Sequence, residues 1–161
     1  MKILCVIPSR IGSTRLARKP LLNIQGKPMI QRVYENARSC SHFNEVVVAT
    51  DSEEVANLIQ AQGGTAIMTA ENIQTGSDRA AVVAKQYPDM DIVLNLQGDE
   101  PFITPIMLEQ LIAPYLAQQT PEMTTFATPL LPEDINNPGA VKVITDLQHN
   151  AIYFSRTPIP Y

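Results

Sequence analysis

The sequence predicts an α/β fold with a mostly parallel central sheet flanked by helices and an antiparallel or mixed edge. Short apolar runs alternate with segments of helical periodicity as far as residue 118, which is typical of βαβ units. Beyond residue 120, strand-like runs follow one another with no helix between them. With 45% hydrophobic and 17% charged residues over 161 positions, the composition indicates one globular domain, residues 1–161, and excludes disordered, fibrous and membrane classes.

The first strand, helix and second strand follow from apolar periodicity. Residues 2–7 are an apolar run that ends at Pro8, which predicts a strand buried on both faces. Residues 28–38 place apolar side chains at helical spacing, and their leading proline suits a first helical turn. Residues 45–50 are apolar and rich in valine, so we expect a second strand there.

The later elements are predicted by the same patterns. A helix is expected over residues 53–62, with Asp51 or Ser52 as its N-cap. Strand and helix then alternate over residues 65–68, 77–87, 91–96 and 105–118. Pro114 must end or kink the last of these helices. Three runs without intervening helices read as strands, over residues 123–128, 140–145 and 151–155.

Basic residues are concentrated at the N-terminus. The first 34 residues contain no acid and seven bases, which are Lys2, Arg10, Arg15, Arg18, Lys19, Lys27 and Arg32. The rest of the chain has the other five bases and all sixteen acids, a net charge of −11, so the total of −4 conceals a basic segment. This asymmetry predicts an anionic ligand near the N-terminus.

The cysteines and the apolar segments indicate a cytoplasmic protein. Cys5 and Cys40 are the two cysteines, which makes a disulfide framework improbable and favours a reducing cytosol. The N-terminal apolar run is too short for the core of a signal peptide. The longest uncharged stretch, residues 55–70, falls short of the roughly 20 apolar residues of a membrane span.

The loop after the first strand has the residues of a phosphate site. Ligands of open α/β sheets bind beyond the carboxyl ends of the strands. Residues 8–19 carry Arg10, Arg15, Arg18 and Lys19, and the intervening Gly-Ser-Thr segment offers backbone and hydroxyl donors to phosphate. The alternative is a basic loop that merely faces water. The segment matches neither a Walker A loop nor a dinucleotide-binding glycine motif.

Two further loops contribute candidate residues. Asp99 and Glu100 follow the predicted strand 91–96, where a carboxylate can hold Mg²⁺ on substrate phosphates, although such a turn is often structural. Ser77 and Asp78 open a helix and are alternatively its caps. A basic loop and an acidic loop at neighbouring strand ends together fit a nucleoside triphosphate with Mg²⁺.

These loops resemble those of the 3-deoxy-manno-octulosonate (Kdo) cytidylyltransferases, also called CMP-Kdo synthetases. The matching segments are IPSRIGSTRLARKPL (7–21), GKPMIQRVYENA (26–37), VVVATD (46–51), QTGSDR (74–79), DIVLNLQGDEP (91–101), AVKVI (140–144) and AIYFSRTPIPY (151–161). The resemblance implies a nucleotide-diphospho-sugar transferase-like fold. It also implies transfer of cytidylyl from CTP to Kdo, giving CMP-Kdo and pyrophosphate for lipopolysaccharide assembly.

The resemblance also implies the roles of individual residues. It assigns nucleotide binding to Pro8, Ser9, Arg10, Ser13, Arg15, Lys19, Ser77 and Arg79, sugar binding to Gln97 and Arg156, and Mg²⁺ binding to Asp99, with Arg10, Lys19 and Asp99 as the catalytic set. CTP and Kdo are the expected small-molecule partners, with neither nucleic acid nor membrane. A homodimer is expected of the full-length family.

The chain departs from the family pattern in sequence and in length. The family usually has Ala, Pro and Gly where this chain has Ser9, Ala17 and Arg18, and commonly His at Ile73. Family members continue for roughly another third beyond the PIPY segment, so we expect an N-terminal portion of the catalytic domain with weak or absent turnover. The alternatives are a cytidylyltransferase for another sugar acid, of 8-amino-Kdo or sialic-acid type, and a non-catalytic CTP-binding or interaction module.

Overall fold

The computed structural model describes residues 1–12 and 16–159. Contacts within the chain divide it into two compact units, residues 1–120 and residues 121–161, which are described separately. The single domain expected from the sequence stays a prediction.

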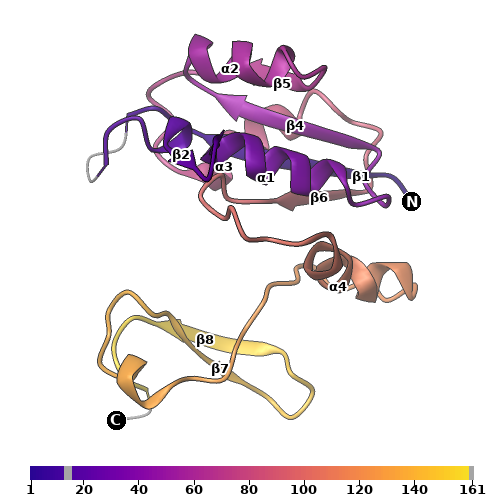
Figure 1. Ribbon diagram of the computed structural model, residues 1–161. Coiled ribbons are helices and arrows are strands. Elements are labelled where there is room, and N and C mark those ends of the chain that lie inside the picture. Colours follow the sequence, from indigo (N-terminus) through magenta and orange to yellow (C-terminus); the bar gives the residue numbers. More distant parts are fainter. Residues whose placement is uncertain (13–15, 160–161) are drawn as a thin grey trace. The chain divides into compact units, whose positions relative to one another are not determined.

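A parallel sheet forms the centre of the first unit (Figure 1). Among the described residues it has four strands in the order β5-β4-β1-β6, with bounds Thr65–Met68, Glu45–Thr50, Ile3–Ser9 and Ile92–Asn95. The register aligns Cys5 of β1 with Val46 on one side and with Leu94 on the other. This confirms the predicted parallel sheet, and it places the carboxyl ends of all four strands along one edge.

Helices cover both faces of this sheet. Helices α1 (Met29–Arg38), α2 (Glu53–Gln60) and α4 (Pro105–Leu116) contribute to one buried cluster, and α3 (Gly76–Ala84) contributes to the other. Alternate residues of β1 divide between the clusters, with Ile3 and Ile7 in the first and Leu4 and Val6 in the second. As predicted, β1 is buried on both faces, which explains its uninterrupted apolar sequence.

The ends of three helices refine or differ from the sequence-based prediction. Ser52 caps α2 by accepting a hydrogen bond from the Val55 N–H at 3.4 Å, so Asp51 is not the cap. Thr75 caps α3, in place of Ser77 or Asp78. The helix α4 continues past Pro114 for two residues and ends at Leu116.

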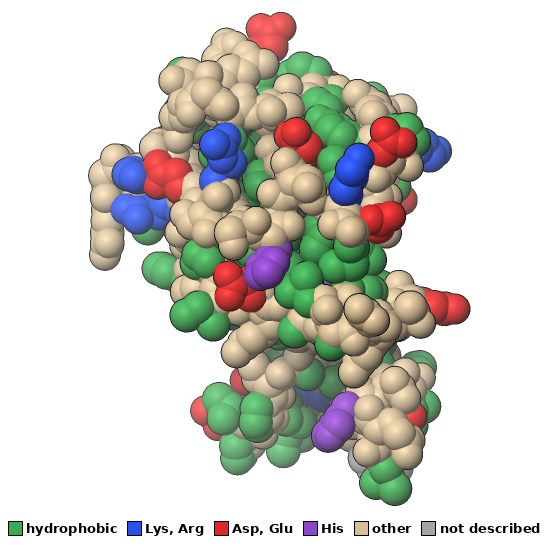
Figure 2. Space-filling view, turned by 90° about the vertical axis from the view of Figure 1, so that its right-hand side faces the viewer, with side chains coloured by type: hydrophobic (Ala, Val, Ile, Leu, Met, Phe, Trp, Pro, Cys, Tyr) green, Lys and Arg blue, Asp and Glu red, His purple; other side chains and the backbone are tan. Residues whose placement is uncertain are grey.

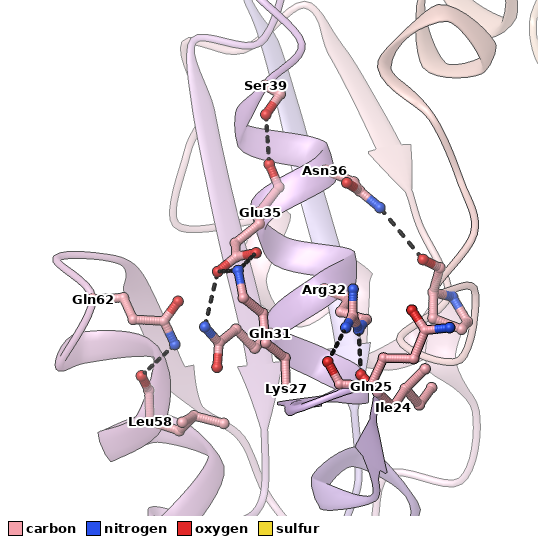
Figure 3. Close-up of polar contacts among 11 residues, drawn as sticks. Ile24, Gln25, Lys27, Gln31, Arg32, Glu35, Asn36, Ser39, Leu58 and Gln62 are labelled. Atoms are coloured by element: carbon pink, nitrogen blue, oxygen red, sulfur yellow. Dashed lines mark hydrogen bonds and ion pairs between the residues drawn. The ribbon is translucent and has the colours of Figure 1, made fainter.

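Two of the N-terminal bases fasten α1 to the short hairpin that precedes it (Figure 3). The hairpin consists of β2 (Asn23–Ile24) and β3 (Lys27–Pro28). Arg32 donates hydrogen bonds to the carbonyls of Ile24 at 2.6 Å and Gln25 at 2.7 Å. The ammonium of Lys27 lies 2.7 Å from the Glu35 carboxylate. These two bases are therefore engaged by contacts within the fold.

The second unit contains an antiparallel pair, β7 (Lys142–Thr145) and β8 (Ala151–Ser155). These strands confirm two of the three late predictions and form a sheet of their own. The strand predicted over residues 123–128 is wrong, because those residues form no strand. Their β-branched and aromatic side chains favour a strand, but within the described residues no neighbouring strand pairs with them.

The buried interior is consistent with the class predicted from composition. Both cysteines are free and buried, so they form no disulfide. Burial raises the pKa of the Cys5 thiol, with the nearby Cys40 as a smaller cause. In the part of the chain that the structure describes, no helix combines the length and the apolar character needed to cross a membrane.

The Glu35 contact makes stability depend on pH in a defined direction. The hydrogen bond from Lys27, followed by that from Gln31, lowers the pKa of Glu35 below its ordinary value. A carboxyl with a lowered folded pKa stabilises the protein above its unfolded pKa of about 4.3, and that contribution disappears as the pH falls through the folded value. We expect Glu35→Gln to melt at a lower temperature than wild type at pH 7, and by a smaller margin near pH 3. Calorimetric melting at the two pH values checks this; an equal gap at both would contradict it.

Candidate nucleotide-binding site

A pocket of about 520 Å³ lies at the carboxyl edge of the parallel sheet. It is formed by the end of β1, the basic loop that follows, the segment before α3, and the loop after β6. Seven of the residues predicted for the site line it, namely Pro8, Ser9, Arg10, Lys19, Arg79, Gln97 and Asp99. Ser13 and Arg15 lie outside the described residues. Positions far apart in the sequence thus meet where the strand-end rule expects a ligand.

Glycines permit the close approach of the loops that form this pocket. A Cβ atom at Gly98 would lie 2.8 Å from the carbonyl oxygen of Pro8. A Cβ atom at Gly76 would lie 2.9 Å from the Gln97 side-chain oxygen and 3.2 Å from the Pro8 ring. Neither backbone has room for a larger residue without a shift, so these two glycines set the spacing of the pocket wall.

The predicted triphosphate ligand and the predicted metal ligand contact each other. The Lys19 ammonium lies 2.6 Å from the Asp99 carboxylate, although the two residues are 80 positions apart in sequence. Both side chains remain partly exposed, at 37% and 48%. An exposed pair of this kind contributes about 0–1 kcal/mol, so a more strongly charged ligand can separate it.

Arg10 and Arg18, both in the basic loop, have different contacts. Arg10 is exposed and lines the pocket. Arg18, the extra charge relative to the family pattern, pairs instead with Glu54 through two contacts of 2.6 Å. On the face drawn in Figure 2, basic and acidic side chains are interspersed among the described residues, without a broad basic patch. Of the three bases of this loop that the structure describes, Arg10 and Lys19 line the pocket and Arg18 does not.

Arg79 lines the pocket but is 1% exposed, and its charge is paired within the protein. Its guanidinium lies 3.2 Å from the Asp51 carboxylate and also donates to the Thr69 hydroxyl. Sequence reasoning missed Asp51, which it considered as a helix cap. The position of Asp51 in the sequence could have revealed it, because Asp51 directly follows β4 and so lies at the same edge of the sheet as the predicted loops.

A chain of amide side chains orients Gln97. Its Nε2 donates to Asn95 at 3.1 Å, and Asn95 in turn donates to the Ser77 hydroxyl at 3.2 Å. Ser77 therefore reaches the pocket through Asn95 and is not itself a lining residue. Ser9 lines the pocket with a buried hydroxyl that has no hydrogen-bond partner among the described residues. A buried hydroxyl without a partner is unfavourable, so a ligand atom that accepts its hydrogen bond would be stabilised there.

Arg156, predicted to bind the sugar, belongs to the second unit. Its Nη1 donates to the Pro138 carbonyl at 2.9 Å. The buried Lys142 ammonium donates to the backbone carbonyls of Asn137, Ala140 and Arg156, at 2.6, 2.9 and 3.1 Å. These bonds tie the backbone that precedes β7 to the residue that follows β8, so the Arg156 segment is held by a buried cation.

The donor set fits a magnesium ion shared with a ligand better than an ion held by protein alone. Among the described residues, no group of three or more His, Cys, Asp or Glu side chains could hold a metal. Of the described residues that line the pocket, only Asp99 has an acidic side chain. Mg²⁺ is commonly held by one or two carboxylates together with substrate phosphates and water, and a single exposed carboxylate at the edge of this pocket suits that arrangement.

A family profile matches nearly the whole chain. The profile, described as Cytidylyltransferase, covers residues 4–161. The chain belongs to the cytidylyltransferase family. This confirms the family resemblance seen in the loops that line the pocket.

The relatives of this cytidylyltransferase chain carry a more specific name. A 3-deoxy-manno-octulosonate cytidylyltransferase from Acaryochloris marina (strain MBIC 11017) is 51% identical over 100% of this chain and 66% of its own length. One from Synechococcus elongatus (strain ATCC 33912 / PCC 7942 / FACHB-805) is 44% identical with the same coverage. The chain therefore spans 66% of the length of these relatives.

A solved structure supports the same fold. The CMP:2-keto-3-deoxy-manno-octonic acid synthetase complexed with CTP matches with a TM-score of 0.84 and 42% identity, over 100% of this chain and 66% of that one. A cytidylyltransferase from Leptospira borgpetersenii matches with a TM-score of 0.64 and 27% identity, over 74% of this chain and 50% of that one. The predicted fold class is confirmed.

The close approach at Gly98 gives a test of the pocket in this cytidylyltransferase. We expect Gly98→Ala to push the loop after β6 away from Pro8, because backbone on both sides cannot give way cheaply. The expected cost is about 1–3 kcal/mol of unfolding free energy. Gly12→Ala is the control, since a Cβ there meets nothing within 4 Å. Equal urea-unfolding free energies for the two variants would show that Gly98 does not lie so close to the Pro8 carbonyl.

Proposed function

We propose that this chain provides the CTP site of a 3-deoxy-manno-octulosonate cytidylyltransferase, which transfers cytidylyl from CTP to Kdo and releases pyrophosphate. The observation that supports it best is the meeting of Lys19 and Asp99 beside Arg10 at one pocket. Cations for a triphosphate and a carboxylate for its metal are the groups this chemistry needs. The identity of 51% to a relative with that name supports the choice of sugar acid.

The proposed reaction is a displacement at phosphorus. The anomeric hydroxyl of Kdo attacks the α-phosphorus of CTP and releases its proton to water, an O–P bond forms, and the bond to the pyrophosphate leaving group breaks. Catalysis of this type consists mainly of positioning and charge stabilisation. Arg10 and Lys19 would neutralise the triphosphate, with Ser13 and Arg15 contributing from the same loop.

The remaining predicted residues would position the two substrates. Pro8 and the unpartnered Ser9 hydroxyl lie where the first loop would pass the nucleotide. Ser77, acting through Asn95, would orient Gln97, and Gln97 would contact the sugar acid. The guanidinium fork of Arg156 suits the sugar carboxylate.

Asp99 would hold Mg²⁺, which when bound would neutralise charge on the triphosphate oxygens. Before CTP binds, Asp99 neutralises the Lys19 ammonium. Upon binding, Lys19 would exchange this carboxylate for phosphate oxygens. The lysine and the carboxylate therefore hold each other in place until the substrate arrives.

Removal of Lys19 tests the nucleotide site. A hydrogen bond to a charged group contributes about 1.5–3 kcal/mol, so Lys19→Ala should weaken CTP binding roughly 10- to 100-fold in the presence of Mg²⁺. Lys85→Ala is a matched control, because Lys85 is exposed at the end of α3 and loses the same charge. Titration calorimetry with CTP measures both. Wild-type affinity in Lys19→Ala would refute the proposed site.

A separate assay tests the sugar. Pyrophosphate release is measured with CTP and equal concentrations of Kdo, 8-amino-Kdo or a sialic acid. We expect Kdo to give the fastest release of the three acids, however slow the turnover of this chain is. A faster rate with one of the other acids would assign the chain to that substrate, while the calorimetric result with CTP would still stand.

A further inference from the structure

A buried network of polar side chains joins the loops that follow β1, β4 and β5. The Asp51 side chain is 7% exposed and the Arg79 side chain 2%. One Asp51 oxygen accepts the Ile11 N–H at 2.9 Å, and the other lies 3.2 Å from the Arg79 guanidinium. Arg79 also donates to the Thr69 hydroxyl, and this hydroxyl in turn donates to the Thr50 carbonyl at 3.0 Å.

Burial at this depth determines what these charges can do. A buried guanidinium is strongly unfavourable unless an acid and further acceptors surround it. Arg79 has Asp51, Thr69 and the Ile73 carbonyl as partners, the last at 3.4 Å. Its positive charge is therefore directed into the protein, toward the strand ends, and is compensated there.

The Asp51 carboxylate has a role apart from the helix that begins beside it. Ser52 caps α2, so the helix does not need Asp51. Its two oxygens instead connect the backbone of the basic loop with Arg79 on α3. Ile11 directly follows Arg10, so fixing the Ile11 N–H fixes the point from which the Arg10 side chain extends into the pocket.

We infer that Asp51 and Arg79 are positioning residues, an ion pair that holds the start of the phosphate-binding loop through the Ile11 N–H. The inference rests on the proposed CTP site. Neither residue need contact the nucleotide through its charge. They act through the Ile11 N–H, which sets the position of Arg10 beside the pocket.

The variant Asp51→Asn separates this role from a direct contact of Arg79 with CTP. It keeps an oxygen for the Ile11 N–H but removes the charge that compensates Arg79. If Arg79 held the phosphates directly, its uncompensated charge would strengthen CTP binding. If the pair positions the loop, the weaker neutral hydrogen bond should lower CTP affinity about tenfold and leave CMP affinity within about twofold of wild type.

Control variants distinguish the proposed role from a general effect of losing charge or of unfolding. Glu35→Gln removes one carboxylate and its hydrogen bonds away from the pocket, and it should bind CTP like wild type. Arg79→Lys retains the charge but not the fork that reaches several partners, so it should weaken CTP binding as Asp51→Asn does. Thermal melting shows that each variant is folded at the temperature of the titration.

Amide hydrogen exchange of Ile11 gives a readout that needs no nucleotide. In Asp51→Ala we expect this amide to exchange about tenfold faster than in wild type, with unchanged protection in β4. Unchanged or stronger CTP binding by folded Asp51→Asn would overturn the inference and leave the CTP site standing. If wild type binds no CTP, the proposed function fails, and unchanged exchange at Ile11 would then overturn the positioning role as well.

Discussion

The strand β1 is buried along its entire length and is paired on both edges, with β4 on one side and β6 on the other. Every other part of the first unit is arranged around it. Its alternate side chains supply both apolar clusters, so the helices on the two faces are held by the same strand. Because its backbone must leave the sheet at Ser9, the basic loop has to begin at the edge where the other three strands of the sheet also end.

Two of the three described bases that line the pocket, Lys19 and Arg79, are paired with carboxylates before any ligand arrives, and the two pairs differ. Lys19 and Asp99 form an exposed pair whose members can separate at little cost. Asp51 and Arg79 form a buried pair whose separation would leave an uncompensated charge in the interior. One pair is suited to exchange partners with a substrate, and the other is suited to stay unchanged while that exchange occurs.

The sequence predicts most of the fold and the location of the site, because both depend on local patterns and one topological rule. Apolar runs of strand length predict β1, β4 and β6, and the strand-end rule brings Arg10, Lys19 and Asp99 together. Residues 123–128 have the side chains of a strand, yet a strand also needs a partner, which local pattern does not reveal. Arg79 shows the same limit, since its partner Asp51 lies 28 positions earlier and decides whether its charge faces a ligand.

The long reach of the sheet contacts affects how the chain folds during synthesis. The Lys2 N–H donates a hydrogen bond to the carboxylate of Asp91, 89 residues further along the chain. At translation rates of about 5–20 residues per second, β1 emerges roughly 5–18 s before the strand that covers its second edge. During that interval β1 is an apolar strand with one unpaired edge, which is the feature that promotes pairing with other chains.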